Sequence, residues 1–416
     1  MQATRPLPVT VRAMNAVGRR LRRLGVPLVS LDEEALLAAA RKRTGLSDFG
    51  GETFREGMRR LIRSLEDEAE LSTLGRFVAR TEFLMFLENR LRIHEWRRTH
   101  PEIARVKVER PIFIVGMPRT GTTILHEVLA QDPRVRVPMT WEVDRPCPPP
   151  ETATYTTDAR IAEIQKNLDR SESLIPDFKR MHPMGAELPQ ECVRITAYDF
   201  ASMIFHTTYR IPSYARWLHE EADLAPAYAL HRRVLQHLAW RCPRERWVLK
   251  SPGHLWAIED LMREYPDACL VQTHRDPLKI IASLTSLVSV LRTMASDRVD
   301  RLEIAREWAD TVRAGLESSV GARQRGIVPP AQIIDVQFRE FIRDPLAVIR
   351  TIYERFGLEL SADAEARMRA FLAANPDDKH GKHTYRFADT GLDLGTERER
   401  VAAYQRFFDV PSEASV

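Results

Sequence analysis

Hydrophobic and polar residues alternate in two different ways along this chain, and the change lies near residue 106. Before it, apolar residues recur every three or four positions, as on one face of an α-helix. The pattern is clearest at Val11, Met14, Val17, Leu21 and Leu24, and it continues in "LDEEALLAAARKR" and "FREGMRRLIRSLEDEAEL". This spacing predicts a helical N-terminal region over residues 1–105.

From residue 106 onward, short apolar runs alternate with segments of helical periodicity. The runs cover residues 112–115, 247–249, 269–272 and 333–336. Such alternation is typical of a parallel sheet with helices on both faces, in which ligands bind at the carboxyl ends of the strands. We therefore expect an α/β domain over residues 106–416, a three-layer fold around a central parallel sheet.

The segment of about residues 145–245 interrupts this alternation. It opens with "PCPPP" and is rich in aromatic residues and helix formers. We interpret it as a helical insertion that shapes a pocket for a second substrate, although a scaffold role explains the same composition.

Composition narrows the class of protein. With 44% hydrophobic and 29% charged residues, the chain has the composition of an ordinary globular protein. Its 62 basic and 58 acidic residues are too evenly balanced to indicate a nucleic-acid binder. The four cysteines lie far apart without metal-ligand spacing, which predicts reduced thiols and a cytoplasmic location. The N-terminus does not resemble a signal peptide, and the least polar stretch, "IIASLTSLVSV", is too short to cross a bilayer.

The first predicted helix is strongly basic. It carries Arg12, Arg19, Arg20, Arg22 and Arg23 beside its apolar positions. A basic amphipathic helix can lie weakly on an anionic membrane surface, or it can pack on its own domain. Both interpretations stay open at this point.

One stretch, "FIVGMPRTGTTILHEVLA", joins an apolar strand to a helix through a turn rich in glycine and threonine. The spacing of Gly116 and Gly121 is that of a nucleotide-triphosphatase phosphate loop, but Thr122 stands where such loops carry lysine. Backbone N–H groups and hydroxyls at a helix N-terminus form an anion cradle. The cradle consists of Pro118, Arg119, Thr120, Gly121, Thr122 and Thr123.

A second motif, "LVQTHRDPLKIIASL", places Arg275 directly after a predicted strand and Ser283 on the following helix. An arginine and a serine can bind one phosphate through charge-assisted and hydroxyl hydrogen bonds. Taken alone, this stretch also has the form of an ordinary helix start with Pro277 at its first position.

Together the two motifs resemble those of the sulfotransferases that use 3'-phosphoadenylyl sulfate (PAPS). "PRTGTT" is similar to their 5'-phosphosulfate loop, and Arg275 with Ser283 resembles their 3'-phosphate site. Further stretches, "GLSDFGGETFREGMRRL", "ELPQECVRI", "LKSPGHLWAIEDLMREYPDA" and "HTYRFADTGLD", resemble the large bacterial members with a helical N-terminal extension. The resemblance implies a P-loop-like fold.

The resemblance also implies a reaction. A hydroxyl of a small-molecule, lipid or glycan acceptor attacks the sulfur of PAPS in line, and adenosine 3',5'-bisphosphate (PAP) leaves without help from a metal ion. Lys250 resembles the lysine that contacts the transferring group. For the general base, Glu142 and His254 are the candidates, and the resemblance does not decide between them.

Near the C-terminus, "KHGKHTYRF" resembles the basic segment that closes over the 3'-phosphate in this family, and Lys382 is assigned that role. His380 and His383 in the same stretch lack a third ligand for zinc. Glu187 and Glu191 are candidates for lining the acceptor site, and a solvated or helix-capping role explains them equally well. No dimerisation motif is apparent, which leaves the oligomeric state open.

Two other functions are compatible with the cradle. One is a magnesium-dependent nucleotide kinase, which Thr122 disfavours, and the other is a catalytically silent nucleotide-binding protein. The identity of the acceptor is not encoded in any motif.

Overall fold

The structure is a computed structural model that describes residues 7–26, 28–174, 184–375 and 385–413. Lys382, His380 and His383 lie outside these residues. The described part contains a five-stranded sheet in the order β2-β3-β1-β4-β5, with all neighbours parallel. The strands are β1 (Ile112–Val115), β2 (Val135–Arg136), β3 (Arg246–Ser251), β4 (Cys269–His274) and β5 (Ile333–Gln337).

The four strands predicted from apolar runs are confirmed. β2 is the strand that the sequence pattern missed, because two residues are too short for a recognisable apolar run. Helices cover both faces of the sheet, so the predicted three-layer α/β fold is also confirmed.

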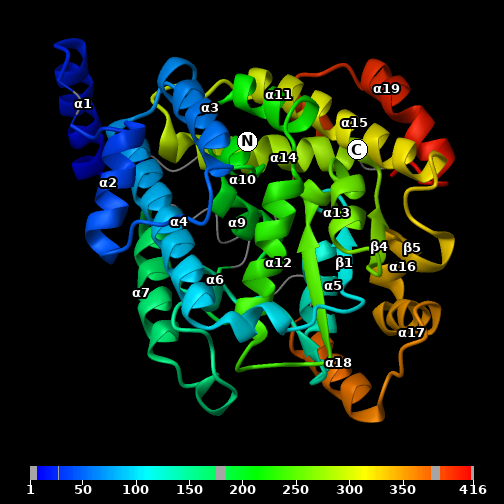
Figure 1. The fold of residues 1–416 in the computed structure, drawn as a ribbon. Helices are drawn as coiled ribbons and strands as arrows, with labels where there is room; N and C mark the ends of the chain where they lie inside the picture. The colour runs from blue at the N-terminus through cyan, green and yellow to red at the C-terminus, as the bar shows by residue number, and fades with distance from the viewer. Residues whose placement is uncertain (1–6, 27, 175–183, 376–384, 414–416) are drawn as a thin grey trace.

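One face of the sheet packs against the helices that follow β1 and β5. Ile112, Ile114 and Val248 point toward this side, where they meet Leu125 of α5 and Ile349 of α17. The elements on or near this face are α5 (Thr122–Leu129), α16 (Phe338–Arg343), α17 (Pro345–Arg355) and α18 (Ala362–Ala374). In Figure 1, α16, α17 and α18 lie together in orange.

The other face, which includes Phe113 and Leu249, belongs to a larger core. The elements after β3 and β4 that contribute to it or extend it are η4 (Pro252–Leu255), α13 (Ile258–Glu264), α14 (Pro277–Ala295), α15 (Arg301–Gln324), η5 (Pro330–Gln332), η6 (Phe387–Thr390) and α19 (Leu394–Phe407).

The segment between β2 and β3 is helical and joins the same core. Its elements are α6 (Thr140–Asp144), η2 (Thr152–Thr154), α7 (Ala159–Leu174), α9 (Cys192–Thr196), η3 (Ala197–Asp199), α10 (Ile204–Thr208), α11 (Pro212–Glu220) and α12 (Ala225–Ala239). The aromatic residues of this segment are largely buried: Tyr198, Phe200, Phe205, Tyr209 and Tyr214 are at most 1% exposed. They therefore serve packing.

The N-terminal helices are not a separate unit, because their apolar residues share the larger core. Phe83 of α4 packs edge-on against Phe200 and Phe205 of the inserted segment. The N-terminal elements are α1 (Val9–Arg23), α2 (Glu33–Thr44), α3 (Phe54–Asp67), α4 (Thr73–Thr99) and η1 (Pro101–Arg105).

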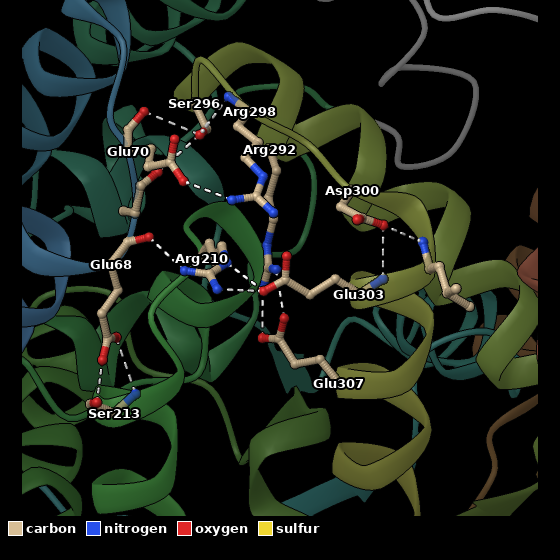
Figure 2. Close-up of polar contacts among 12 residues, drawn as sticks. Glu68, Glu70, Arg210, Ser213, Arg292, Ser296, Arg298, Asp300, Glu303 and Glu307 are labelled. Carbon is tan, nitrogen blue, oxygen red and sulfur yellow. Dashed lines mark hydrogen bonds and ion pairs between the residues drawn. The ribbon is translucent and has the colours of Figure 1, made fainter.

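Polar contacts also tie the N-terminal helices to the centre of the chain (Figure 2). Arg210 donates to the backbone oxygen of Glu68 at 2.8 Å and to the carboxylate of Glu303 at 2.6 Å. Arg292 of α14 and Glu307 of α15 form two hydrogen bonds of 2.6 and 2.7 Å. These contacts link the α3–α4 connection to α14 and α15.

Among the described helices, α14 has the length and composition of a membrane span, with a mean hydropathy of 1.4. It is longer than the apolar run in the sequence indicated. In this fold 72% of its most apolar window is buried inside the protein, so α14 is a core helix.

The Arg292–Glu307 pair leads to a prediction about the stability of the protein. Arg292 is 2% exposed, so Glu307→Gln leaves a buried guanidinium without its anion and should lower the free energy of unfolding by about 3–5 kcal/mol at neutral pH. Burial disfavours the charged carboxylate, but Arg292 and His206 outweigh it and hold the pKa of Glu307 at about 2.

Because this pKa lies below the unfolded value of about 4.3, the stabilisation is present above that pH and is lost as the pH falls toward 2. Denaturant unfolding across this range should show the difference between variant and wild type shrinking with acid. Glu317→Gln, an exposed position on the same helix, should cost less than about 1 kcal/mol. Equal losses for both variants would contradict the prediction.

Candidate active site

β1 and β3 end at the same level of the sheet, and the neighbouring strand β4 continues two residues further, to His274. Val115 at the end of β1 is in register with Ser251 of β3 and with Gln272 of β4. The phosphate loop follows β1, Lys250 is the penultimate residue of β3, and Arg275 directly follows β4. The alignment therefore brings three groups that are far apart in the sequence to one edge.

The phosphate loop is braced against β4. A Cβ on Gly116 would lie 2.1 Å from Thr273 Oγ1, so no larger residue fits without a shift. Thr120 Oγ1 lies 2.6 Å from the same Thr273 oxygen and donates to the Met117 carbonyl at 2.7 Å. The side chain of Thr120, predicted to belong to the anion cradle, thus supports the loop.

The loop turns into α5 through two left-handed residues. Gly121 caps the helix with φ of 88°. Arg119 adopts φ of 74°, which costs a residue with a side chain about 1–2 kcal/mol. Such conformations cluster at ligand clamps. The turn directs the N-terminus of α5, with Thr122 and Thr123, toward the edge of the sheet, as an anion site requires.

Arg275 reaches the phosphate loop directly. Its Nη1 donates to the Arg119 carbonyl at 3.0 Å, and its guanidinium lies 4.0 Å from the ring centroid of Phe338. Its Nε and Nη2 donate to the two carboxylate oxygens of Glu413 at 2.7 and 3.1 Å. Arg275, which the sequence predicts to bind the 3'-phosphate, is therefore paired with a carboxylate of the chain itself.

The helix after Arg275 begins as the sequence indicates. Pro277 is its first residue, and Asp276 caps it by accepting from Leu278 N at 3.0 Å. Asp276 also pairs with Arg398 of α19 and accepts from Glu413 N at 2.8 Å, which anchors the C-terminal segment beside Arg275. Ser283 lies on α14 and is 4% exposed.

Lys250 forms the central ion pair of the site. Its Nζ donates to Glu191 Oε1 at 2.7 Å and to Thr123 Oγ1 at 3.1 Å. The side chain is 3% exposed, so it does not extend into solvent. Lys250 thereby connects β3, the start of α5 and Glu191 at the N-cap of α9.

Glu142 occupies a structural position. It is fully buried, its Oε2 accepts from Arg136 at 2.7 Å, and its Oε1 accepts from Met139 N at 2.9 Å. Burial raises the pKa of Glu142, and the neighbouring Arg136 opposes that rise. These contacts are those of a helix cap and a buried counterion, and they weigh against the predicted role as base.

His254 is also enclosed. It lies in η4, is 2% exposed and shares a 2.7 Å hydrogen bond between its Nδ1 and Tyr228 OH. Burial lowers its pKa well below the usual value. Among the described residues, neither His254 nor Glu142 forms a hydrogen bond with Lys250 or with the phosphate loop.

Glu191 is the acidic residue that does contact this machinery. The sequence marked it as a candidate for lining the acceptor site or for capping a helix, because nothing local relates it to Lys250, 59 positions away. Glu187, its neighbour in the same motif, is exposed. The described part of the chain holds no group of three or more His, Cys, Asp or Glu side chains arranged for a metal ion.

A parallel sheet with a lysine-free phosphate loop, a lysine on the neighbouring strand β3 and an arginine after β4 is the arrangement expected of a nucleotide-dependent transferase of P-loop-like fold. The profile of the sulfotransferase family matches residues 111–362, and this chain belongs to that family. It is therefore a sulfotransferase, and members of the family use PAPS as donor.

Solved structures and curated proteins agree with this assignment. The crystal structure of sulfotransferase STF9 from Mycobacterium avium is 31% identical, covers 92% of this chain and 98% of its own, and superposes with a TM-score of 0.85. The crystal structure of sulfotransferase STF1 from Mycobacterium tuberculosis H37Rv is 33% identical, covers 89% of this chain and 98% of its own, and superposes with a TM-score of 0.80. Omega-hydroxy-beta-dihydromenaquinone-9 sulfotransferase Stf3 of Mycobacterium bovis is 27% identical over 284 residues, which are 66% of this chain and 69% of that protein.

Proposed function

We propose that this sulfotransferase transfers the sulfuryl group of PAPS to a hydroxyl of an apolar small molecule or lipid in the cytoplasm. The observation that carries the proposal is the meeting of the phosphate loop, Lys250 and Arg275 at one edge of the sheet. The name of the relative Stf3 supports the acceptor class, because it describes a hydroxylated menaquinone, which is a lipid.

The residues divide the work of the reaction. The acceptor oxygen forms a bond to sulfur while the bond from sulfur to the 5'-phosphate oxygen breaks, and PAP leaves with added negative charge. That negative charge can be stabilised by Arg119, Thr122, Thr123 and the N-terminus of α5. The positive charge of Lys250 can bind the oxygens of the sulfuryl group.

For the general base we propose Glu191. In the structure its carboxylate is held by Lys250, and a sulfuryl group that attracts Lys250 would release the carboxylate to accept the proton of the acceptor hydroxyl. Glu142 is committed to Arg136, and burial lowers the pKa of His254 and so makes it a weak base, which favours Glu191 over both.

Donor binding tests the proposed site directly. Arg275→Ala should weaken PAP binding at least tenfold, because a charge-assisted phosphate contact contributes about 1.5–3 kcal/mol. Calorimetric titration with PAP, ADP and ATP, with and without magnesium, measures this. Arg60→Ala, an exposed arginine on α3, is the matched control. Tighter, magnesium-dependent binding of ATP would favour a kinase instead.

The same titration tests the contact of Glu413 with Arg275. The 3'-phosphate must displace this carboxylate, so Glu413→Gln should tighten PAP binding by on the order of threefold to tenfold. Weaker binding in this variant would mean that Glu413 helps to hold the nucleotide and does not compete with it.

Glu191→Gln should lower kcat by about 10² to 10⁴ while the Kd for PAP stays nearly unchanged, since a base acts only in the chemical step. Transfer of labelled sulfate from PAPS to 2-naphthol, or to a better acceptor from a screen, measures the rate. The exposed neighbour Glu187→Gln should behave as wild type. PAP binding without transfer to any acceptor by the wild type would indicate a silent binding protein.

Glu142→Gln separates the structural role from the catalytic one. It should lower the free energy of unfolding by about 3–5 kcal/mol, because Arg136 loses its buried anion, and leave the rate per folded molecule near wild type. A large fall in kcat at unchanged stability would restore Glu142 as the base.

We further propose that α1 contacts an anionic membrane surface. The helix packs on the protein through Asn15, whose Oδ1 accepts from Leu74 N at 3.0 Å, and through Gly18. Its apolar side faces outward, with Val17 58% and Leu24 72% exposed. Arg20 and Arg23 are exposed beside that side, whereas Arg19 pairs with Asp297 of the protein body. An apolar stripe beside basic residues suits a lipid headgroup layer.

Co-sedimentation with phosphatidylglycerol–phosphatidylcholine vesicles tests this contact. Wild type should bind in a salt-sensitive manner, and a Val17→Glu, Leu24→Glu double variant should bind at least tenfold more weakly. Leu394→Glu, an equally exposed apolar position on α19, is the control. A dimer that dissociates in the double variant, without vesicle binding by the wild type, would assign this face to a second copy.

A further inference from the structure

The last described residues of the chain, 411–413, form a short C-terminal tip that contains neither helix nor strand. The backbone turns toward the tip at Asp409, which has a left-handed φ of 51°. Val410 is 5% exposed and belongs to the larger core, and its N–H donates to the Gln405 carbonyl of α19 at 2.8 Å. The core therefore anchors the chain as far as Val410, and the C-terminal tip extends beyond this anchor.

The C-terminal tip is held at the donor site by few contacts. The Glu413 carboxylate accepts from Nε and Nη2 of Arg275 at 2.7 and 3.1 Å, and the Glu413 N–H donates to Asp276 at 2.8 Å. The contact from Gln405 Nε2 to Ser412 Oγ is long, at 3.4 Å. The side chain of Glu413 is 30% exposed, so water weakens its attraction to the arginine. The tip can therefore leave without disturbing a helix or a strand.

Arg275 has contacts that hold it in place without the C-terminal tip. Its Nη1 donates to the Arg119 carbonyl at 3.0 Å, and its guanidinium lies 4.0 Å from the ring centroid of Phe338. These contacts fix the orientation of the edge formed by Nε and Nη2, which the Glu413 carboxylate occupies. Phosphate binds arginine through the same pair of parallel hydrogen bonds. A phosphate and the Glu413 carboxylate therefore exclude each other from this edge.

The charge of Asp276 stays compensated when the C-terminal tip leaves. Asp276 is 1% exposed, and its two carboxylate oxygens accept from Arg398 of α19 at 2.7 and 3.0 Å. An uncompensated carboxylate next to Arg275 would repel an arriving phosphate. The pair with Arg398 prevents this repulsion and does not involve the tip.

We propose that the C-terminal tip is a reversible internal competitor of the donor's 3'-phosphate. A nucleotide that carries this phosphate displaces Glu413 from Arg275 and frees the tip, and the tip returns to Arg275 when PAP leaves. A nucleotide without the 3'-phosphate leaves the tip in place. The inference rests on the proposed donor site and adds a conformational change that limits how tightly the product PAP is retained.

Hydrogen–deuterium exchange of the full chain, with fragmentation that resolves single amides, tests the displacement. The amide of Glu413 donates to Asp276, so saturating PAP should make it exchange about tenfold faster. Saturating ADP, which lacks the 3'-phosphate, should leave its exchange unchanged. The amide of Val410, inside the anchor, should stay protected in both cases. Unchanged or slower exchange at Glu413 with PAP would overturn the inference.

Calorimetry tests whether the competition depends on the 3'-phosphate. If the tip occupies Arg275 in about 90% of molecules, PAP binds about tenfold more weakly than it would to the open site. Glu413→Gln should therefore recover up to this factor for PAP and leave the affinity for ADP unchanged. Glu399→Gln, at an exposed glutamate of α19, is the matched control and should change neither affinity. An equal gain for PAP and ADP in Glu413→Gln would contradict competition with the 3'-phosphate.

The outcomes separate this inference from the proposed function. Failure of the wild type to bind PAP would defeat the proposed donor site itself. PAP binding that leaves the Glu413 amide protected, with no gain of affinity in Glu413→Gln, would overturn only the role of the C-terminal tip. Faster exchange at Glu413 with PAP alone, together with a gain of affinity for PAP alone, would support it.

Discussion

The edge at which three parallel strands end is the constraint on which this site depends. β3 and β1 stop at one level and β4 stops two residues further on, and the three strands bring different groups to the same edge: Lys250, the phosphate loop and Arg275. Hydrogen bonds then lock these groups together, from Lys250 to Thr123 and from Arg275 to the Arg119 carbonyl. A shift of one strand along its neighbour would separate them, because each residue advances a strand by about 3.3 Å.

Compensation of buried charge explains most of the other polar contacts around this edge. Lys250 holds Glu191, Arg275 holds Glu413, and the deeper Arg136 holds Glu142. A cation removed from water needs an anion close by. The first two pairs involve the cations that an anionic donor is proposed to contact, so donor binding exchanges an internal carboxylate for a ligand anion. In the third pair both residues are buried, so this pair belongs to the scaffold.

Prediction from the sequence succeeded where the signal is local. Apolar runs located four of the five strands, and the glycine spacing located the turn after β1 and the helix that follows it. β2 was missed because two residues carry no periodicity. Glu142 was proposed as base from its place after the first helix, but a glutamate three residues after Met139 can equally cap a helix, and burial beside Arg136 favours that use. Thr120 was grouped with the anion ligands, yet its hydroxyl braces the loop against Thr273.

The sequence by itself determined the class of fold, the phosphate loop and the positions of Lys250 and Arg275 at strand ends, because these features depend on residues within a few positions of one another. Only the tertiary structure decided which side chains meet. Glu191 reaches Lys250 across 59 positions and Glu413 reaches Arg275 across 138. Both contacts arise where separate elements pack, and the energy of such contacts depends on burial that no local pattern records.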